Sequence, residues 1–514
     1  MSSLILHRIS RQVIECGKRS YRLEPTIAKF SFSQTGTHTT QVQARTEVTS
    51  ANREVIFSEG NGKSVTDSEL TFEWSQLQTA YQSKRNEEIL RAMFVLKICS
   101  YDTFVRNSMQ LMSLGRWVLG RTLFEFLLRN TMYSQFVAGE TLPAIQNTIR
   151  ELRQCGIGTM LCVPNEEDLS TDYDNFRDRE AMFDRNANAI FDCIGKTAVL
   201  NLNTLFWSQL LEEGGFSQMK VTAICSPMLL NVLNKHLAPY EASTEALEGL
   251  DIPSFARGFD GKLNVPVLND NQNEHLFNVM KRLDKFAEAC INRNVRLVID
   301  AEQTYLQAAI NQLVLVLQYK YNRNNPWVYN TYQCYRKDTY DRVMANLELM
   351  QRLGFHFGAK IVRGAYMTME RNRAADMGYD DPIHNSYEDT CRMYDQVVDT
   401  LLHLASRTPA EVMIASHNEE SVKLVVQRMK ELGIAQDAGK ISFGQLYGMC
   451  DQVSFLLGQK GFNVYKSVPY GPVGEALAYL GRRATENRDV IKRTEKERSL
   501  LWQELRRRIT SLAH

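Results

Sequence analysis

The spacing of apolar residues divides the chain into regions of different periodicity. From residue 67 to residue 154 apolar positions recur with helical spacing, in blocks such as 88–96 and 121–128, and Pro143 is the only proline of that stretch. We therefore expect helices over 67–154 that pack as an arm or cap. Residues 31–66 are rich in Thr, Ser, Gln and Gly and have few large apolar side chains, which is typical of a linker.

After Gly156 short β-type apolar runs recur, and each is followed by a longer helical pattern. This alternation predicts an α/β fold, namely a parallel (β/α)8 TIM-type barrel within residues 155–514, rather than an open doubly wound sheet. No G-x-G-x-x-G motif follows the first run, so a conventional dinucleotide-binding fold is not supported. Residues 237–273 form an insertion between the second and third strands. The expected strands are 158–163, 219–225, 295–299, 328–332, 359–362, 412–415, 441–443 and 462–466.

Composition excludes several classes of protein. The chain has 514 residues, of which 44% are hydrophobic and 23% charged, and its formal net charge is +1. A disordered chain would be less apolar, and a nucleic-acid-binding protein would show a basic excess. No apolar run approaches the roughly 18 residues that a transmembrane helix needs. The ten cysteines are scattered singly, without zinc-type spacing, so we expect reduced thiols and no metal site.

The positive charge is concentrated at the two ends. Residues 1–30 have a net charge of +4, which is typical of a mitochondrial transit peptide; the alternative is a disordered basic tail. Residues 482–508 have a net charge of +5. In this C-terminal stretch one helical face is apolar, and it either meets an anionic membrane or docks on the barrel with its basic side in water. That face consists of Leu501, Leu505, Ile509 and Leu512.

Polar residues gather where the predicted strands end, which is where a barrel carries its chemistry. The third strand ends near Asp300 and Glu302, and the second begins around Lys220. The structural alternative is that these carboxylates form ordinary ion pairs with Lys220 or Arg363. His417 could likewise be a histidine at the barrel rim whose hydrogen bonds are satisfied within the protein. Further polar residues at the ends of strands four to eight are Gln333, Lys360, Arg363, His417, Asn418, Gln445 and Tyr470.

A cluster of arginines follows the eighth strand. If 473–487 is helical, Tyr479, Arg482, Arg483 and Glu486 share one face. Two adjacent guanidinium groups repel each other unless they share an anion, and their planar donors suit a small carboxylate. The alternative is a solvent-exposed basic helix end.

Six segments, in order along the chain, together resemble the proline dehydrogenase (proline oxidase) family of mitochondrial flavoenzymes. The resemblance runs from about residue 100 to 508 and implies a distorted (βα)8 barrel whose last helix lies over the mouth, with FAD at the C-terminal ends of the strands. The segments are Val298–Gln303, Thr331–Tyr335, Lys360–Tyr366, Ala415–Glu420, Phe443–Met449 and Tyr479–Asn487.

The resemblance also implies roles for individual residues. Arg482 and Arg483, assisted by Lys220, would pair with the substrate carboxylate, and Asp300 would hold Lys220. The ring of the substrate would be enclosed by Tyr366, Leu446, Tyr470 and Tyr479. The flavin would be contacted by Gln333, Lys360, Arg363, Gly364, Ala365, His417, Asn418 and Glu486.

The reaction implied is oxidation of L-proline to Δ1-pyrroline-5-carboxylate. Hydride would pass from C5 to flavin N5 without a protein nucleophile, and the electrons would pass to a ubiquinone-type acceptor. The enzyme would then lie on the matrix side of the inner mitochondrial membrane, with peripheral membrane contact. Protein groups would tune the flavin electrostatically, and orientation and water exclusion would supply catalysis.

Three alternatives stay open. A sister group oxidises 4-hydroxyproline and has a more open, polar eighth-strand loop, whereas the loop here, 469–472, is bulky and apolar. A barrel lyase would use Lys220 or Lys360 as a Schiff base, with Asp300 or Glu302 as acid or base. The third alternative is a catalytically silent, membrane-associated scaffold.

Overall fold

The fold was analysed in a computed structural model of the chain. The structure describes residues 80–81, 83–101, 103–104, 107–162, 176–202, 215–240, 252–259, 261, 264–474, 476, 480–481 and 495–511. All of them belong to one compact unit, Trp74–His514. The predicted transit peptide and linker lie outside the described residues, and so do Tyr479, Arg482, Arg483 and Glu486.

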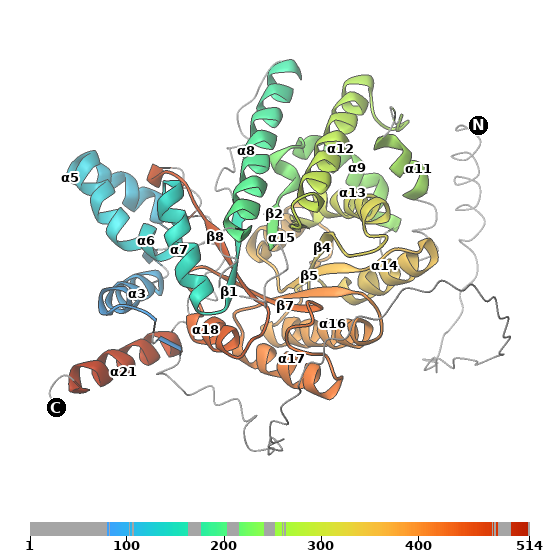
Figure 1. Ribbon diagram of the computed structural model, residues 1–514. Helices are drawn as coiled ribbons and strands as arrows, with labels where there is room; N and C mark the ends of the chain where they lie inside the picture. The colour runs from blue at the N-terminus through green and yellow to red at the C-terminus, as the bar shows by residue number, and fades with distance from the viewer. Residues whose placement is uncertain are drawn as a thin grey trace, which may run out of the picture. The chain divides into compact units, whose positions relative to one another are not determined.

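Eight parallel strands form a closed barrel in the order β1 to β8, which confirms the predicted fold class (Figure 1). Each strand pairs with the next one along the chain, and β8 closes onto β1. The strands are β1 (Ile157–Cys162), β2 (Phe216–Met219), β3 (Arg296–Ile299), β4 (Val328–Gln333), β5 (Gly358–Val362), β6 (Glu411–Ala415), β7 (Ile441–Leu446) and β8 (Val464–Pro469).

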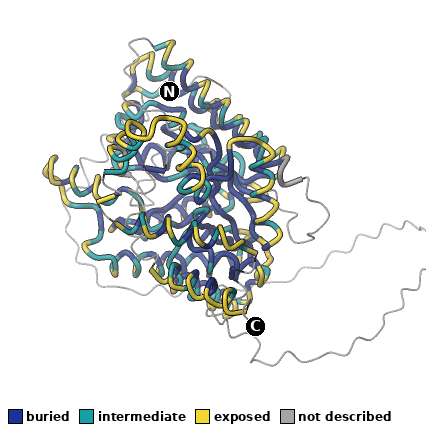
Figure 2. Tube along the Cα trace, turned by 90° about the vertical axis from the view of Figure 1, so that its left-hand side faces the viewer, coloured by how far each residue is buried: buried dark blue, intermediate teal, exposed yellow. Residues whose placement is uncertain are grey.

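Large side chains fill the interior of the barrel. The ring of Phe216 meets Tyr329 edge-on at a centroid distance of 5.3 Å and Tyr465 at 4.8 Å. Met160, Val298 and Met413 complete this buried layer, so the centre is a packed core rather than a pore. In Figure 2 the strands accordingly run as dark blue traces through the middle of the described chain.

Helices follow the strands and cover the barrel. The insertion between β2 and β3 includes α11 (Ile252–Ala256), and its Ile252 and Phe259 belong to the same hydrophobic cluster as α12 and α13. The covering helices are α8 (Phe176–Leu202), α9 (Pro227–Leu237), α12 (Asp270–Ile291), α13 (Thr304–Tyr321), α14 (Thr339–Leu353), α15 (Met367–Met377), α16 (Tyr387–Arg407), α17 (Glu419–Glu431) and α18 (Asp451–Gln459).

The region before the barrel is helical, as its periodicity predicted. No helix within the described ranges is both long enough and apolar enough to span a membrane. The nine cysteines that the structure describes are free thiols, in agreement with the prediction. The elements are α3 (Asn86–Cys99), α5 (Ser108–Leu128), the π-helix η3 (Arg129–Tyr133), α6 (Ser134–Phe136) and α7 (Leu142–Gln154).

The C-terminal helix α21 (Glu495–Ser511) docks on protein rather than presenting its apolar face to lipid. Leu501 and Leu505 are buried in a cluster with Ile89 and Leu96 of α3. The membrane interpretation of this face is therefore wrong for these two leucines, because α3 supplies the apolar partner that the pattern required. Ile509 is exposed, and Leu512 lies outside the described residues.

Candidate active site

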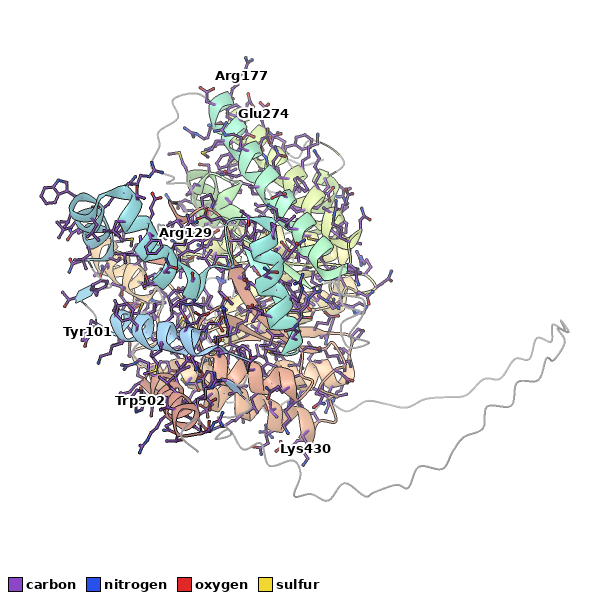
Figure 3. All side chains as sticks on the ribbon, turned by 60° about the vertical axis from the view of Figure 1, so that its left-hand side comes forward. Tyr101, Arg129, Arg177, Glu274, Lys430 and Trp502 are labelled. Carbon is purple, nitrogen blue, oxygen red and sulfur yellow. The ribbon has the colours of Figure 1, made fainter. Side chains whose placement is uncertain are left out.

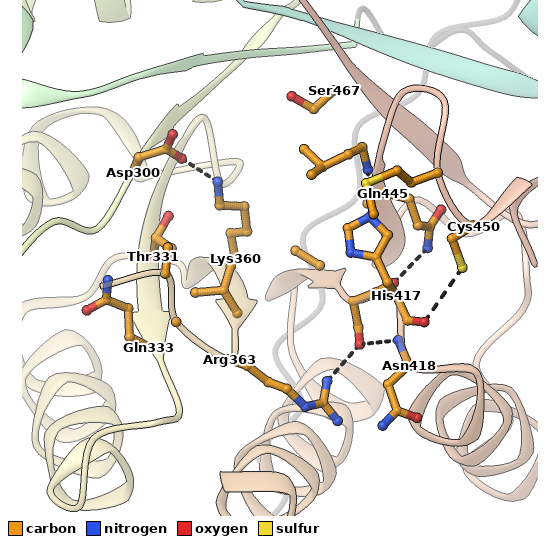
Figure 4. A pocket seen from close by; sticks show the side chains of 18 of the residues that line it. Asp300, Thr331, Gln333, Lys360, Arg363, His417, Asn418, Gln445, Cys450 and Ser467 are labelled. Atoms are coloured by element: carbon orange, nitrogen blue, oxygen red, sulfur yellow. Dashed lines mark hydrogen bonds and ion pairs between the residues drawn. The ribbon is translucent and has the colours of Figure 1, made fainter. Parts of the chain in front are cut away.

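A cavity of about 480 Å³ opens at the C-terminal ends of the strands. Most of the predicted site residues line it, and Figure 4 shows how they converge from β3 to β8. Tyr470 is not among the lining residues; its ring lies 4.9 Å from the Lys196 ammonium of α8. The predicted residues on the cavity wall are Lys220, Asp300, Gln333, Lys360, Arg363, Gly364, Ala365, Tyr366, His417, Asn418 and Leu446.

Lys220 follows β2 rather than beginning it, which corrects the predicted strand. The apolar residues after Lys220 form a 3₁₀ turn, Val221–Ala223. Glu302 holds this turn, because its carboxylate accepts hydrogen bonds from Thr222 N at 3.1 Å and Thr222 Oγ1 at 2.7 Å. Lys220 therefore lies at the barrel mouth, with its ammonium 6.0 Å from the Tyr366 ring centroid.

Asp300 takes part in an ion pair that the sequence did not predict. Its carboxylate pairs with Lys360 of β5 (Figure 4). Both side chains of the pair are mostly buried, at 10% exposure for Lys360 and 22% for Asp300. Glu302 makes its bonds to Thr222 instead, and burial raises the pKa of its carboxyl group. The two carboxylates thus have separate tasks, one facing the cavity and one fixing a turn.

Arg363 is held rigidly at the end of β5. Its two terminal nitrogens donate to Ser416 Oγ at 2.7 Å and Ser421 Oγ at 2.8 Å, and its guanidinium lies 4.2 Å from the ring centroid of Tyr394. Among the described residues nothing bonds to the third nitrogen, Arg363 Nε, or to Gln333 Oε1, although both atoms are buried. Unsatisfied polar atoms on a cavity wall point to a ligand that satisfies them.

His417 is a neutral imidazole with a fixed orientation. Its Nε2 accepts the Leu446 N–H at 3.0 Å, so the ring proton lies on Nδ1. Burial, together with the nearby positive charges of Lys466 and Arg363, lowers the pKa of His417 to about 3. Asn418 instead caps α17, because its Oδ1 accepts from Glu420 N and Ser421 N. The structural alternative, a histidine whose hydrogen bonds are satisfied within the protein, therefore holds for Nε2 of His417.

Gly364 is required by packing inside the protein. Its φ is +139°, and a Cβ at this position would lie 2.4 Å from the ring of Tyr335. The family resemblance implies that Gly364 contacts the flavin, and the close contact among the described residues is with Tyr335. Gly364 and Ala365 still line the cavity.

Sequence reasoning missed the buried lysine that fixes the loop after β7. Lys466 of β8 is fully buried; its ammonium donates to Leu446 O at 3.2 Å and to Met449 O, and pairs with Asp451 at 2.9 Å. Asp451 also pairs with Lys84 at 2.8 Å. Although burial opposes ionisation, the two ammonium groups lower the pKa of Asp451 to about 2. Lys466 lies inside a strand, and nothing in the sequence indicates that its side chain organises the site.

Helix α21 supplies a second group that the sequence did not reveal. Glu497 lines the cavity, and its carboxylate accepts from Cys450 N at 3.0 Å and Asp451 N at 3.2 Å at the start of α18. Burial and the nearby Asp451 charge raise the pKa of Glu497 to about 7. Beside it, Lys496 pairs with Glu419 of α17 at 2.6 Å. The cavity wall therefore depends on a segment well after β8 in the sequence.

Solved structures share the fold. Proline utilization A from Bdellovibrio bacteriovorus matches with a TM-score of 0.55 at 17% identity, over 80% of this chain and 38% of that one. A bifunctional proline utilization A protein matches with a TM-score of 0.52 at 15% identity, over 84% of this chain and 43% of that one. The chain thus spans well under half the length of these larger proteins.

Sequence relatives cover nearly the whole described unit. Hydroxyproline dehydrogenase of Xenopus laevis is 39% identical over 84% of this chain and 89% of its own length. Proline dehydrogenase 1, mitochondrial, of Homo sapiens is 34% identical over 85% of this chain and 90% of its own length. A family model described as proline dehydrogenase matches residues 148–496, which include the entire barrel. The chain belongs to the proline dehydrogenase family.

Proposed function

We propose that this protein is an FAD-dependent dehydrogenase that oxidises L-proline to Δ1-pyrroline-5-carboxylate. The observation that carries the proposal is the cavity at the strand ends, which lies within the segment matched by the family model. Its wall combines a buried ion pair, a fixed guanidinium and a neutral imidazole. The family resemblance assigns Lys360, Arg363 and His417 of this wall to the cofactor, and it assigns Asp300 to the substrate side. A silent scaffold would have no need to keep these groups.

The residues present fit a flavin. Arg363 Nε and Gln333 Oε1 are buried polar atoms that no described residue satisfies, and His417 Nδ1–H is a fixed donor. Arg363 Nε–H and His417 Nδ1–H are donors that would stabilise the anionic reduced ring, and Gln333 Oε1 is an acceptor for a flavin N–H. A bound flavin would supply the two-electron acceptor for the hydride from proline C5, and the electrons would go on to a ubiquinone-type quinone.

The protein's own contribution is binding and orientation. Arg482 and Arg483 would pair with the substrate carboxylate, with Lys220 beside them, while Tyr366 and Leu446 enclose the ring. The chain just before this arginine pair supports the assignment, because Leu480 packs in a cluster with residues that include Cys162, the last residue of β1. The carboxylate clamp would fix the orientation of the substrate.

No protein nucleophile is needed for this chemistry. A Schiff-base lyase would require a free amine, whereas the Lys360 ammonium pairs with Asp300. Such an enzyme would also leave the arginine pair and the unsatisfied polar atoms of the wall, Arg363 Nε and Gln333 Oε1, without a purpose. The dehydrogenase accounts for both.

A second candidate substrate is 4-hydroxyproline. The hydroxyproline dehydrogenases of Xenopus laevis and Homo sapiens are each 39% identical to this chain, compared with 34% for human proline dehydrogenase 1. Against this stands the bulky, apolar sequence of the loop Pro469–Pro472, although none of its four residues lies on the cavity wall. The ratio of kcat/KM for the two amino acids decides between them, and proline is expected to have the higher value.

Location follows from the same proposal. Two of the relatives, from human and Caenorhabditis elegans, are named as mitochondrial, and residues 1–30 have the charge of a transit peptide. We place the enzyme on the matrix side of the inner membrane, with peripheral contact to the bilayer that holds its quinone.

The test is the absorbance of the purified protein under anaerobic conditions. We expect flavin bands that bleach on addition of L-proline, and an Arg483→Met variant that keeps its flavin but shows a greatly raised KM. The exposed Arg352→Met on α14 serves as the matched control. A colourless protein that forms a borohydride-trappable adduct would contradict the proposal, and an unchanged KM in Arg483→Met would remove the role given to that residue.

A further inference from the structure

Helix α5 exposes apolar side chains that no described part of the protein covers. Trp117 at its tip is 81% exposed, and Arg116 and Arg121 flank it. Isolated exposed apolar residues are normal on proteins, but a contiguous group of large ones marks a site of interaction. The exposed apolar residues of α5 are Leu114, Trp117, Val118, Leu119, Leu123, Phe126 and Leu127.

The shape of α5 limits what can cover these side chains. The helix breaks at Gly120, where φ is +70°, and its two halves fold back so that a Cβ on Gly115 would lie 2.8 Å from the ring of Phe124. At this tip Trp117, Val118 and Leu119 are consecutive and all exposed. Successive residues of a helix lie about 100° apart, so the three point in different directions. One flat protein face cannot bury all three, whereas a lipid layer surrounds an inserted tip on every side.

Helix α3 extends the apolar surface. Its residues Leu90 and Phe94 are exposed on one helical stripe that continues through Tyr101 beyond the helix. Figure 3 views this side of the molecule and labels Tyr101 near the end of α3 and Arg129 at the start of η3. We call α5 together with this stripe of α3 the apolar platform.

The charge around the apolar platform suits an anionic surface. Residues 86–133, from the start of α3 to the end of η3, contain six Lys and Arg and four Asp and Glu, a net charge of +2, in a chain whose total is +1. Exposed aromatic and aliphatic residues beside arginines are typical of elements that lie in the interface of an anionic bilayer. A partner protein would more often present a complementary pocket with polar anchors.

The base of the apolar platform reaches the mouth of the barrel. Tyr133 Oη donates to Gly471 O at 2.6 Å, and Gln135 Nε2 donates to Gly448 O at 2.7 Å. Phe136 packs against the buried cluster of Val95, Cys99 and Met449, and so does Leu446, which lines the cavity. The apolar platform is therefore anchored to the loops after β7 and β8, at the same end of the barrel as the cavity.

We propose that the apolar platform is the membrane-docking surface of this protein and inserts the tip of α5 into an anionic lipid layer. The docking would direct the cavity mouth toward the bilayer that contains a quinone. That consequence rests on the proposed function, whereas the binding of lipid does not. The membrane contact is thus assigned to the apolar platform and not to the C-terminal helix, whose Leu501 and Leu505 are buried.

The test uses the full chain with its cofactor. Binding is measured by co-sedimentation with phosphatidylcholine–phosphatidylglycerol vesicles and with phosphatidylcholine vesicles alone, for the wild type, for Trp117→Glu/Leu123→Glu and for Trp502→Glu. Trp502 is exposed on α21, outside the apolar platform, and is labelled in Figure 3. We expect the wild type and Trp502→Glu to bind the anionic vesicles. The double variant is expected to bind at least about tenfold more weakly, because it gives up the burial of two large apolar side chains.

Two further measurements separate the remaining outcomes. Brominated lipid should quench the wild type more than Trp117→Phe, which locates the inserted residue. Sedimentation velocity shows whether the double variant changes the oligomeric state. If the wild type is a dimer that binds no vesicles and the double variant is a monomer, the apolar platform contacts a second copy of this chain and the proposal is overturned. Equal vesicle binding by all variants would overturn it as well. Proline oxidation with a soluble acceptor should be unchanged in every variant, so an inactive protein that still binds vesicles would refute the proposed function and leave the docking surface intact.

Discussion

Replacing Lys466 by methionine is expected to loosen the loop after β7. The ammonium of this fully buried residue bonds to two carbonyls of the loop, Leu446 O and Met449 O, and to the Asp451 carboxylate. Methionine keeps much of the length of the side chain but makes none of these bonds. The loop positions the Leu446 side chain on the cavity wall and the Leu446 N–H on His417, so its fixation bears on the site.

The magnitude follows from the contacts that are lost and kept. Removing one partner of a buried ion pair costs about 3–5 kcal/mol. Asp451 retains Lys84 at 2.8 Å, so the cost should lie at the lower end, about 3 kcal/mol. If that energy is lost locally, amide exchange in 441–459 should accelerate on the order of 100-fold. The positive charge that lowers the pKa of His417 also disappears, and the KM for the substrate should rise.

Lys440 offers a matched control. Its ammonium also donates to two carbonyls, Ala405 O at 2.8 Å and Thr408 O at 3.2 Å, but the residue is only half-buried and pairs with no carboxylate of the described residues. Lys440→Met should cost about 1 kcal/mol or less and leave KM unchanged. Hydrogen exchange read by mass spectrometry compares the two variants. The reasoning fails if 441–459 exchanges at the wild-type rate in Lys466→Met, or if both variants behave alike.

Two other predictions concern packing and pH. Gly364→Ala should destabilise the protein by on the order of 3 kcal/mol, since a Cβ would meet the Tyr335 ring at 2.4 Å. Gly354 has φ +69° and nothing within 4 Å of an added Cβ, so Gly354→Ala should cost about 1 kcal/mol. Equal urea midpoints for the two variants would contradict this. Because the pKa of Glu497 is raised to about 7 from 4.5, the folded state binds a proton that the unfolded chain has released. The contribution of Glu497 to the free energy of unfolding should therefore fall as pH rises from about 5 to 8, by about 3 kcal/mol in total. The difference between wild type and Glu497→Gln in urea unfolding isolates this term, and a difference that does not vary with pH would refute it.

The eight strands could be located from the sequence because each one is a short apolar run followed by a helical pattern. Most predicted strands end within a few residues of the observed ones. The clear exception is β2, which ends at Met219, because the apolar residues after Lys220 are buried as a turn held by Glu302. Apolarity predicts burial, and a buried turn and a buried strand then look alike.

The candidate site could be predicted as a set of residues but not as a set of contacts. Strand-end positions placed Asp300, Lys360 and His417 together at the mouth, as the cavity bears out. The pairing of Asp300 with Lys360 depends on how far each side chain reaches across the barrel, which no spacing encodes. Glu497 is brought to the wall only by the docking of α21 on α3.

What the sequence by itself determined is which segments must be buried and which groups can do chemistry. Periodicity predicted the barrel, and the conjunction of six motifs predicted the family. Only the tertiary structure decided what each buried face packs against: Leu501 and Leu505 pack against α3, while the apolar side chains of α5 have no cover among the described residues. The physical reason is that the hydrophobic effect is non-directional. A pattern of apolar residues states that a surface leaves water, and the packing of the whole chain determines whether protein or lipid replaces it.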